Sequence, residues 1–478
     1  MPARKLAVTA PDAALAAAID RLVTSLGLPK DFSVDVLVEA DVAAMALPSL
    51  ITRESGYADR TDLEFVTLDP PGAIDLDQAV FIERLSAGYR VWYAIADVPY
   101  FVWPGGEVEA ESFRRGQTVY ALDRRLPLYP TVLSEGVASL LADGKPRLAA
   151  LWQIDLDAAG AVVAGRVDRA IVRNRAQLAY DAVQADLDAG RANETVRLVA
   201  EVGRLRQAQE RARGGVSLDL PEQVADHTPD GWKLSLRQIA PIESWNAQIS
   251  LLTGMVAAQL MLHAGVGILR LVPPAAPANI EHLRRIAASL GLPWPATIGY
   301  PDFLRSLRPD QPTHLAMLSA CRSLFRGAAY TTFDQGAPRY PVDHGAVAAP
   351  YAHVTAPLRR LVDRFGTEIC LAASVGLPPP GWVRTNLTRL PAIMAASEVK
   401  ARQVENGALN LLEALVLADS VGQTFAATVT ARRDRHATIQ LVDPAVEASV
   451  TADVALGSQI TVRLTAGDVE TGRLTFEM

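Results

Sequence analysis

Three aspartates lie within nine positions of this chain and could do chemistry together. They are Asp69, Asp75 and Asp77, and Gln78 follows them directly in the stretch TLDPPGAIDLDQAVF, residues 67–81. Side chains at positions i and i+2 of an extended segment share a face, so Asp75 and Asp77 are expected to lie together. The PPG turn folds Asp69 back toward them. Three carboxylates this close repel one another unless a cation binds between them.

Magnesium suits such a cluster, because it binds a few carboxylates and completes its shell with water and substrate phosphate oxygens. Clustered aspartates therefore indicate phosphoryl chemistry. Zinc is disfavoured, because the seven histidines show no ligand spacing and Cys321 and Cys370 are isolated. The sequence also lacks a phosphate-binding glycine loop and a GxSxG nucleophile elbow. A solvated acidic loop is the structural alternative, since aspartate is common in turns.

The composition is that of a globular protein. The chain has 478 residues, 50% of them hydrophobic and 21% charged, enough for about two to four domains. Its formal net charge of −7 gives no global attraction for polyanions, so any nucleic-acid site must be a local basic channel. The isolated cysteines predict a protein of the reducing cytoplasm. No signal peptide is expected, because Asp12 and Asp20 interrupt the apolar part of the N-terminus.

One apolar segment, residues 249–269, is about as long as the roughly 20 residues that a membrane span requires. Thr253, Gln259 and His263 interrupt it. Unpaired polar groups are costly in lipid. We therefore expect a helix buried inside a soluble domain and no association with a membrane.

The periodicity of the sequence changes along the chain. Residues 1–60 show the apolar spacing of short helices, and residues 63–156 show the period of two that is typical of strands. Helical spacing returns after about residue 176, so strands and helices are segregated, which predicts an α+β fold. Residues 421–478 contain about five short strands, which favours a small closed OB-type barrel over a small β-sandwich. The expected domains are 1–60, 61–420 and 421–478.

Several motifs in order along the chain carry a family resemblance. They are RTDLEFVTLDPPGAIDLDQAV, VWYAIADVPYFV, RRGQTVYALDRRLPLYPTVLSEGVASLLADGKPRLAALW and YAHVTAPLRRLVDR, within about residues 60–420. This segment resembles the RNB catalytic domain of the ribonuclease II and ribonuclease R family. The resemblance implies an RNB domain followed by a C-terminal S1/OB-type β-barrel. A small helical module replaces the two cold-shock barrels that usually precede it, and it is either helix-turn-helix-like or a packing cap.

The resemblance implies that the acids hold magnesium, or manganese, at the bottom of a channel for single-stranded RNA. Asp69, Asp75 and Asp77 fall on the first three of the family's four aspartates, and Gln78 falls on the fourth. Asp77 matches the aspartate on which cleavage relies most. The amide oxygen of Gln78 can still ligate a metal, but without charge, so one of two metals would bind more weakly. We interpret Gln78 as a metal ligand in a tuned site.

Hydrolysis of a phosphodiester also needs a group that offsets charge on the phosphate oxygens. The resemblance places Arg359 at the scissile phosphate, as a second catalytic residue. For Arg360 and Arg364 we expect ordinary surface salt bridges. His353 is expected to have a hydrogen-bonded structural role, because metal-dependent hydrolysis requires no protein base.

Binding RNA of any sequence calls for aromatic faces on which bases stack. Tyr120 lies within a basic stretch and looks like the family tyrosine that stacks on the terminal base, while a core tyrosine is the structural alternative. Glu398 lies near the place of a family glutamate that contacts the 3′-terminal sugar, a contact that would favour RNA over DNA. Tyr351 and Thr355 are predicted to contact the RNA backbone.

The sequence thus predicts a magnesium-dependent 3′→5′ exoribonuclease that acts on single-stranded RNA and releases 5′-nucleoside monophosphates. We expect a monomer without a small-molecule cofactor. One alternative is an RNA-binding regulator of the same fold that does not cut. Another is a metal phosphoesterase for small molecules, which would need neither Tyr120 nor the terminal barrel.

Overall fold

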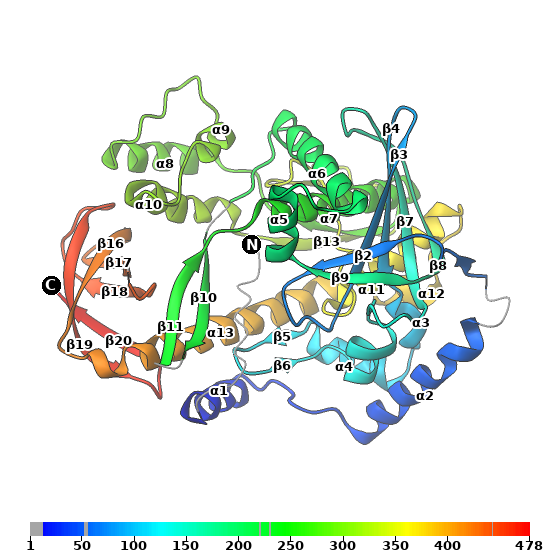
Figure 1. Cartoon of the computed structure of the whole chain (residues 1–478), viewed down its shortest axis with the longest axis horizontal. Helices are drawn as coiled ribbons and strands as arrows, with labels where there is room; N and C mark the ends of the chain where they lie inside the picture. The colour runs from blue at the N-terminus through cyan, green and yellow to red at the C-terminus, as the bar shows by residue number, and fades with distance from the viewer. Residues whose placement is uncertain (1–12, 52–55, 219–220, 229–230, 442) are drawn as a thin grey trace.

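The computed structural model describes residues 13–51, 56–218, 221–228, 231–441 and 443–478. Its centre is a seven-stranded sheet in the order β1-β8-β7-β4-β3-β2-β9 (Figure 1). Most neighbouring strands are antiparallel, whereas β1 pairs with β8 and β2 with β9 in parallel. The strands are β1 (Ala58–Asp59), β2 (Phe65–Asp69), β3 (Gln78–Leu85), β4 (Gly88–Ala96), β7 (Arg147–Asp157), β8 (Val162–Val172) and β9 (Asn174–Ala179).

Helices cover this sheet and form its core with it. The first half of β7 is buried on both faces, as its apolar run RLAALW suggests, and Trp152 is fully buried. Helix α6 (Glu194–Ala212) packs on β3, α11 (Leu361–Ser374) packs on β8, and α7 (Pro241–Ala264) contacts both helices. Segregated helices and strands confirm the predicted α+β class.

Helix α7 contains most of the apolar segment that resembled a membrane span. Among the described residues it is the one helix long and apolar enough to cross a membrane, and more than half of its most apolar window is buried. The predicted segment 249–269 has the wrong boundary. The helix ends at Ala264, because Gly265 adopts the left-handed conformation with φ 71° and caps it, and β12 (Gly267–Leu271) follows.

The two N-terminal helices pack against different parts of the molecule. Helix α1 (Ala13–Ser25) lies on α13 (Leu390–Val416), and its buried residues join the core that includes the barrel. Helix α2 (Val34–Ile51) lies on α4 (Glu107–Arg115) and joins the core of the sheet (Figure 1). The structure therefore favours packing caps over a helix-turn-helix unit.

The C-terminal strands form a closed barrel in the order β16-β17-β18-β20-β19. This arrangement confirms the predicted S1/OB-type barrel and excludes the β-sandwich. Its core contains Val429, Ile439, Val450, Val462 and Phe476. The strands are β16 (Thr424–Arg433), β17 (His436–Leu441), β18 (Glu447–Thr451), β19 (Gln459–Asp468) and β20 (Arg473–Glu477).

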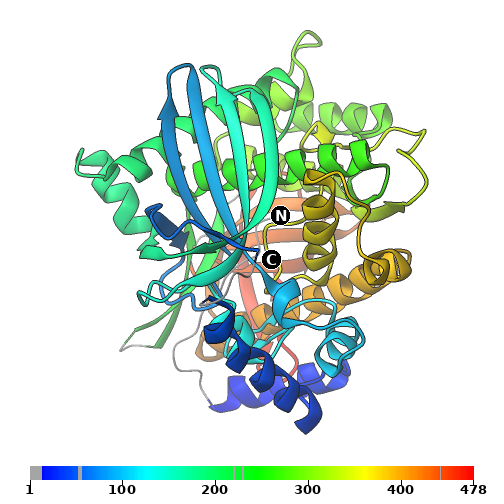
Figure 2. The same ribbon diagram turned by 90° about the vertical axis from the view of Figure 1, so that its right-hand side faces the viewer.

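Helix α13 connects the part that contains the seven-stranded sheet with the barrel, which lies at the opposite end of the molecule from β3 and β4 (Figure 1; Figure 2). The other helices are α3 (Val98–Phe101), α5 (Tyr180–Asp188), α8 (Pro277–Ser289), α9 (Tyr300–Arg305), α10 (Pro312–Cys321) and α12 (Gly381–Leu387). Short strands are β5 (Val119–Tyr120), β6 (Arg125–Leu126), β10 (Glu222–Thr228), β11 (Gly231–Arg237), β13 (Ala329–Phe333), β14 (Asp343–His344) and β15 (Ala349–Pro350).

Candidate active site

The acidic loop connects the end of β2 with the start of β3. A turn at its beginning has Gly72 at φ 78°, a conformation that glycine adopts without strain, and the Ala73 amide donates to the Pro70 carbonyl at 3.3 Å. Further along, Ser139 accepts from the Leu76 amide at 2.9 Å. The loop is therefore fixed at both ends, which orients its aspartates.

Asp77 is the most enclosed of the three acids, with 6% of its surface exposed. Its Oδ1 accepts from the Leu358 amide at 2.7 Å, and the Arg359 Nε lies 3.8 Å from its Oδ2. Burial raises the pKa of Asp77 to about 8, although Arg359 and the Leu358 amide act in the opposite direction. A second cation beside Arg359 would therefore be needed to keep this carboxylate fully ionised at neutral pH.

Asp75 lies in a hydrogen-bonded ion-pair network. Its Oδ2 accepts from the Tyr120 hydroxyl at 2.8 Å, and its Oδ1 accepts from Arg125 Nη1 at 3.1 Å. Arg125 also pairs with Glu135 at 3.2 Å. Burial and the charge of Asp75 raise the pKa of Tyr120, so its hydroxyl stays protonated and donates.

Asp69 is the last residue of β2 and lies in register with Ala179 of β9, next to Tyr180. Burial, and then the charge of Asp69, raise the pKa of Tyr180. The Tyr180 hydroxyl accepts from Asn246 Nδ2 at 3.1 Å. Tyr180 was not singled out from the sequence, because only the parallel pairing of β2 with β9 brings it beside an acid.

Gln78 begins β3 and makes two side-chain hydrogen bonds. Its Nε2 donates to the Thr355 carbonyl at 2.6 Å, and its Oε1 accepts from the Tyr93 hydroxyl at 2.5 Å. The predicted role of Gln78 as a metal ligand stays a prediction, and one of the two lone pairs of its amide oxygen is already used by Tyr93.

The segment 351–360 brings Arg359 to the acids. It presses against α7 at Gly254, where a Cβ atom would lie 2.2 Å from the Tyr351 ring and 2.7 Å from the Ala352 carbonyl oxygen. Only glycine permits this approach. Arg359 is 35% exposed, so its guanidinium is accessible from solvent while it faces Asp77.

The neighbouring arginines do form salt bridges, but the prediction that these lie at the surface was wrong. Arg360 pairs at 2.8 Å with Asp363, whose side chain is fully buried. Arg364 is itself fully buried and pairs at 2.6 Å with Glu109. The reason is that these charges join separate segments inside the core. Asp363 also accepts from the Ala356 amide, and Arg364, the next residue of α11, also donates to the Val102 carbonyl.

His353 is partly buried, and its Nδ1 lies 2.6 Å from the Tyr330 hydroxyl. Burial holds the pKa of His353 well below its usual value, so the ring is neutral, as a structural role requires. Tyr351 and Thr355 are 8% and 3% exposed, and the Thr355 hydroxyl pairs with Ser250 at 2.9 Å. Their predicted contacts with RNA stay predictions and would require the loop to open.

Glu398 lies on α13 and pairs at 3.0 Å with Arg270 of β12. The side chain of Glu398 is 28% exposed, so part of it remains accessible to a ligand. The basic stretch around Tyr120 is largely engaged in internal contacts, because Arg115 is buried against Glu111 and Arg124 pairs with Asp123. It therefore does not form an open basic surface.

The aspartates fit magnesium in the chemistry of their side chains, because they offer hard carboxylate oxygens, and Asp77 is a buried acid that a cation would ionise. Within the described ranges, no three acidic, histidine or cysteine side chains are gathered closely enough to hold an ion. Magnesium usually takes only one or two carboxylates together with substrate phosphates. Asp77, with Asp69 or Asp75, would suffice for such a site.

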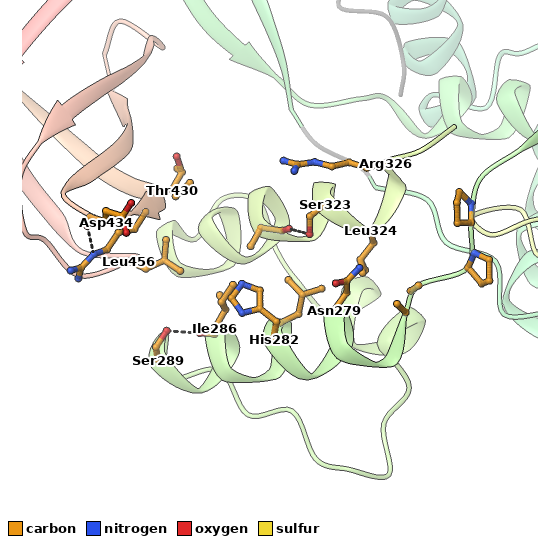
Figure 3. Close-up of a pocket in the computed structure, with 18 of the residues that line it drawn as sticks. Asn279, His282, Ile286, Ser289, Ser323, Leu324, Arg326, Thr430, Asp434 and Leu456 are labelled. Atoms are coloured by element: carbon orange, nitrogen blue, oxygen red, sulfur yellow. Dashed lines mark hydrogen bonds between the residues drawn. The ribbon is translucent and has the colours of Figure 1, made fainter. Parts of the chain in front are cut away.

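A separate cavity of about 990 Å³ lies between α8, α10 and the barrel. Asn279, His282 and Arg326 line it on the helical side and Thr430 on the barrel side (Figure 3). The acids and the segment 351–360 do not contribute to its lining. It is therefore distinct from the acidic site.

Comparisons with known proteins identify the family of this chain. A family model of the RNB domain matches residues 57–367, and a model of the RNase II-type exonuclease C-terminal S1 domain matches residues 423–478. The fold and the acidic site thus define an RNase II-type protein. The chain belongs to the RNB-domain ribonuclease family, which confirms the resemblance.

Two curated relatives and one solved structure illustrate this likeness. Exosome complex exonuclease RRP44 homolog A of Arabidopsis thaliana is 30% identical over 328 residues, 65% of this chain and 34% of that protein. Ribonuclease R 1 of Lactococcus lactis is 24% identical over 432 residues, 84% of this chain and 51% of that protein. The chain thus spans about a third to a half of these relatives' length. Mycoplasma genitalium RNase R in complex with ribose-methylated single-stranded RNA has the same fold, with a TM-score of 0.84, 18% identity, and coverage of 97% of this chain and 78% of that one.

Proposed function

We propose that this chain is a divalent-metal-dependent 3′→5′ exoribonuclease that hydrolyses single-stranded RNA and releases 5′-nucleoside monophosphates. The observation that carries the proposal is the environment of Asp77, which is 6% exposed, accepts from the Leu358 amide and faces Arg359 at 3.8 Å. This pairing of a buried acid with a cationic side chain lies within the RNB match. An acid with a perturbed pKa is typical of functional sites, and an accessible arginine beside it can offset charge on a transferring phosphoryl group.

The residues have distinct proposed roles. Asp77, with Asp69 or Asp75, would hold magnesium or manganese, and a bound divalent ion polarises a phosphate and makes water more acidic. Arg359 offsets the charge that develops on the phosphate oxygens. Tyr120 would stack on a base, with its hydroxyl anchored on Asp75 at 2.8 Å.

The test is a time course with a 5′-labelled single-stranded oligoribonucleotide in magnesium or in excess chelator. The proposal predicts a ladder that shortens from the 3′ end, the appearance of 5′-nucleoside monophosphates, and no products in chelator. Internal cuts, or shortening that is unaffected by chelator, would contradict it. Affinity for RNA should also fall steeply with salt, whereas a small-molecule phosphoesterase would show little salt dependence.

A second candidate function is RNA binding without cleavage. The neutral Gln78 at the place of a family aspartate favours it, because the site then has one negative charge fewer to attract a divalent ion. Tight RNA binding without any shortening in magnesium or manganese would support this candidate. We also propose that the protein is a cytoplasmic monomer, and its two free cysteines, both buried, suit a reducing compartment.

A further inference from the structure

The Gln78 amide is fixed in orientation by partners from two other parts of the chain. A backbone carbonyl only accepts, so the amide nitrogen must face the Thr355 oxygen, 2.6 Å away. The amide oxygen must then face the Tyr93 hydroxyl, 2.5 Å away, in a side chain that is 1% exposed. One of the two lone pairs of the oxygen that a metal would need is thus already used, and the contact fixes the direction in which this oxygen points.

Gln78 and its neighbour Asp77 reach the same distant loop. Asp77 accepts from the Leu358 amide, 281 positions along the chain, and Gln78 donates to the Thr355 carbonyl, 277 positions along. The Thr355 hydroxyl in turn pairs with Ser250 of α7 at 2.9 Å. The amide therefore ties β3 to the loop that carries Arg359 and to the helix behind it.

A carboxylate could not make the same contacts. An ionised aspartate or glutamate only accepts hydrogen bonds, so it would face the Thr355 carbonyl oxygen without a donor between them. Such a side chain would turn away from the loop or push the loop away. The geometry around position 78 is complementary to an amide and unsuited to an anionic ligand.

From these contacts we propose that Gln78 is a positioning residue that clamps the Arg359 loop against Asp77, and not a metal ligand. This inference deepens the proposed function and rests on it for its catalytic consequence. It replaces the expectation that the amide oxygen coordinates an ion. Any divalent ion at the site is then held by carboxylates alone, and the arrangement of Asp77 and Arg359 exists before an ion or RNA arrives.

The test compares Gln78→Ala and Gln78→Glu with wild type and with Gln209→Glu, a control whose exposed amide also donates to a backbone carbonyl. Mn²⁺ titration of the metal-free full chain, without RNA, measures the affinity and number of bound ions. Steady-state cleavage of a single-stranded oligoribonucleotide separates kcat from KM. We expect Gln78→Ala to bind the same number of Mn²⁺ ions as wild type, with an affinity within about twofold. Its kcat should fall at least about tenfold, and its KM should change less than about threefold. Gln78→Glu should lose a similar factor in kcat, and the control should lose none.

A tenfold loss of Mn²⁺ affinity in Gln78→Ala, or a gain of kcat in Gln78→Glu, would overturn the proposal. Should the position 78 variants fail to fold, Tyr93→Phe removes the hydroxyl that donates to the amide oxygen and keeps the ring. It should lower kcat about threefold and leave Mn²⁺ binding unchanged, and a full loss of Mn²⁺ binding there would contradict the clamp. If wild type cleaves no RNA, the proposed function fails. The Mn²⁺ affinity of the variants still decides whether Gln78 is a metal ligand.

Discussion

Replacing Asp77 by asparagine should stabilise the metal-free protein at neutral and alkaline pH. The native pKa of Asp77 is about 8, because the side chain is buried, whereas an unfolded aspartate has a pKa of about 3.9. Between these values the unfolded chain releases a proton that the native state retains. The stability that Asp77 contributes at low pH is therefore lost as pH rises from about 4 to 8, and asparagine escapes this loss.

The magnitude follows from the distance between the two pKa values. Each pH unit above about 3.9 costs the native state about 1.4 kcal/mol, or about 4 kcal/mol at pH 7. Asparagine keeps the acceptor for the Leu358 amide, so most of that contact survives. Since the native site can relax around a charge, we expect Asp77→Asn to be about 2 to 4 kcal/mol more stable at pH 7 and about equal to wild type at pH 4.

The assay is urea unfolding of both proteins in chelator between pH 4 and pH 9. The exposed aspartate Asp41 on α2 gives a matched control, and Asp41→Asn should change stability by less than about 0.5 kcal/mol throughout. Added magnesium should narrow the gap, because an ion that binds wild type better than the variant stabilises wild type. A difference between Asp77→Asn and wild type that does not vary with pH would refute the reasoning.

Substitutions at three further positions probe other parts of the account. Arg359→Ala should lower kcat by about a hundredfold with little effect on RNA affinity, since its charge acts mainly on the transition state; equal losses in kcat and affinity would point to a binding role. Tyr120→Ala should weaken RNA binding by about 1 to 3 kcal/mol in a filter-binding titration. Tyr120→Phe loses the hydrogen bond to Asp75 but keeps the stacking ring, so it should bind RNA nearly as wild type does. Arg364→Ala should destabilise the fold by about 3 to 5 kcal/mol, because it leaves Glu109 as an unpaired buried charge; a midpoint of urea unfolding equal to that of wild type would contradict this.

The sequence predicted the acids but not what surrounds them. Asp69, Asp75 and Asp77 stood out because few functions need such spacing, and the extended loop before β3 is as expected. The hydrogen-bond partners of these acids could not be predicted from the neighbouring residues in the sequence. Asp77 meets the Leu358 amide 281 positions away, and a contact of that separation follows only from the packing of the loop on α7.

The same limit explains the expectations that failed. Arg364 looked like a surface residue because charged side chains are seldom buried, yet Glu109 compensates its charge inside the core. The end of α7 was placed too late because the apolar run continues through the Gly265 cap into β12. Apolar periodicity alone did not separate a buried helix from the strand that follows it.

The most direct test of the central claim is a single-turnover experiment in which wild type and Asp77→Asn are each mixed in excess with a 5′-labelled single-stranded oligoribonucleotide and magnesium. The account predicts that both proteins bind the RNA with similar affinity, and that only wild type shortens it stepwise from the 3′ end. Cleavage by Asp77→Asn at the wild-type rate, or binding by wild type without any shortening, would contradict it.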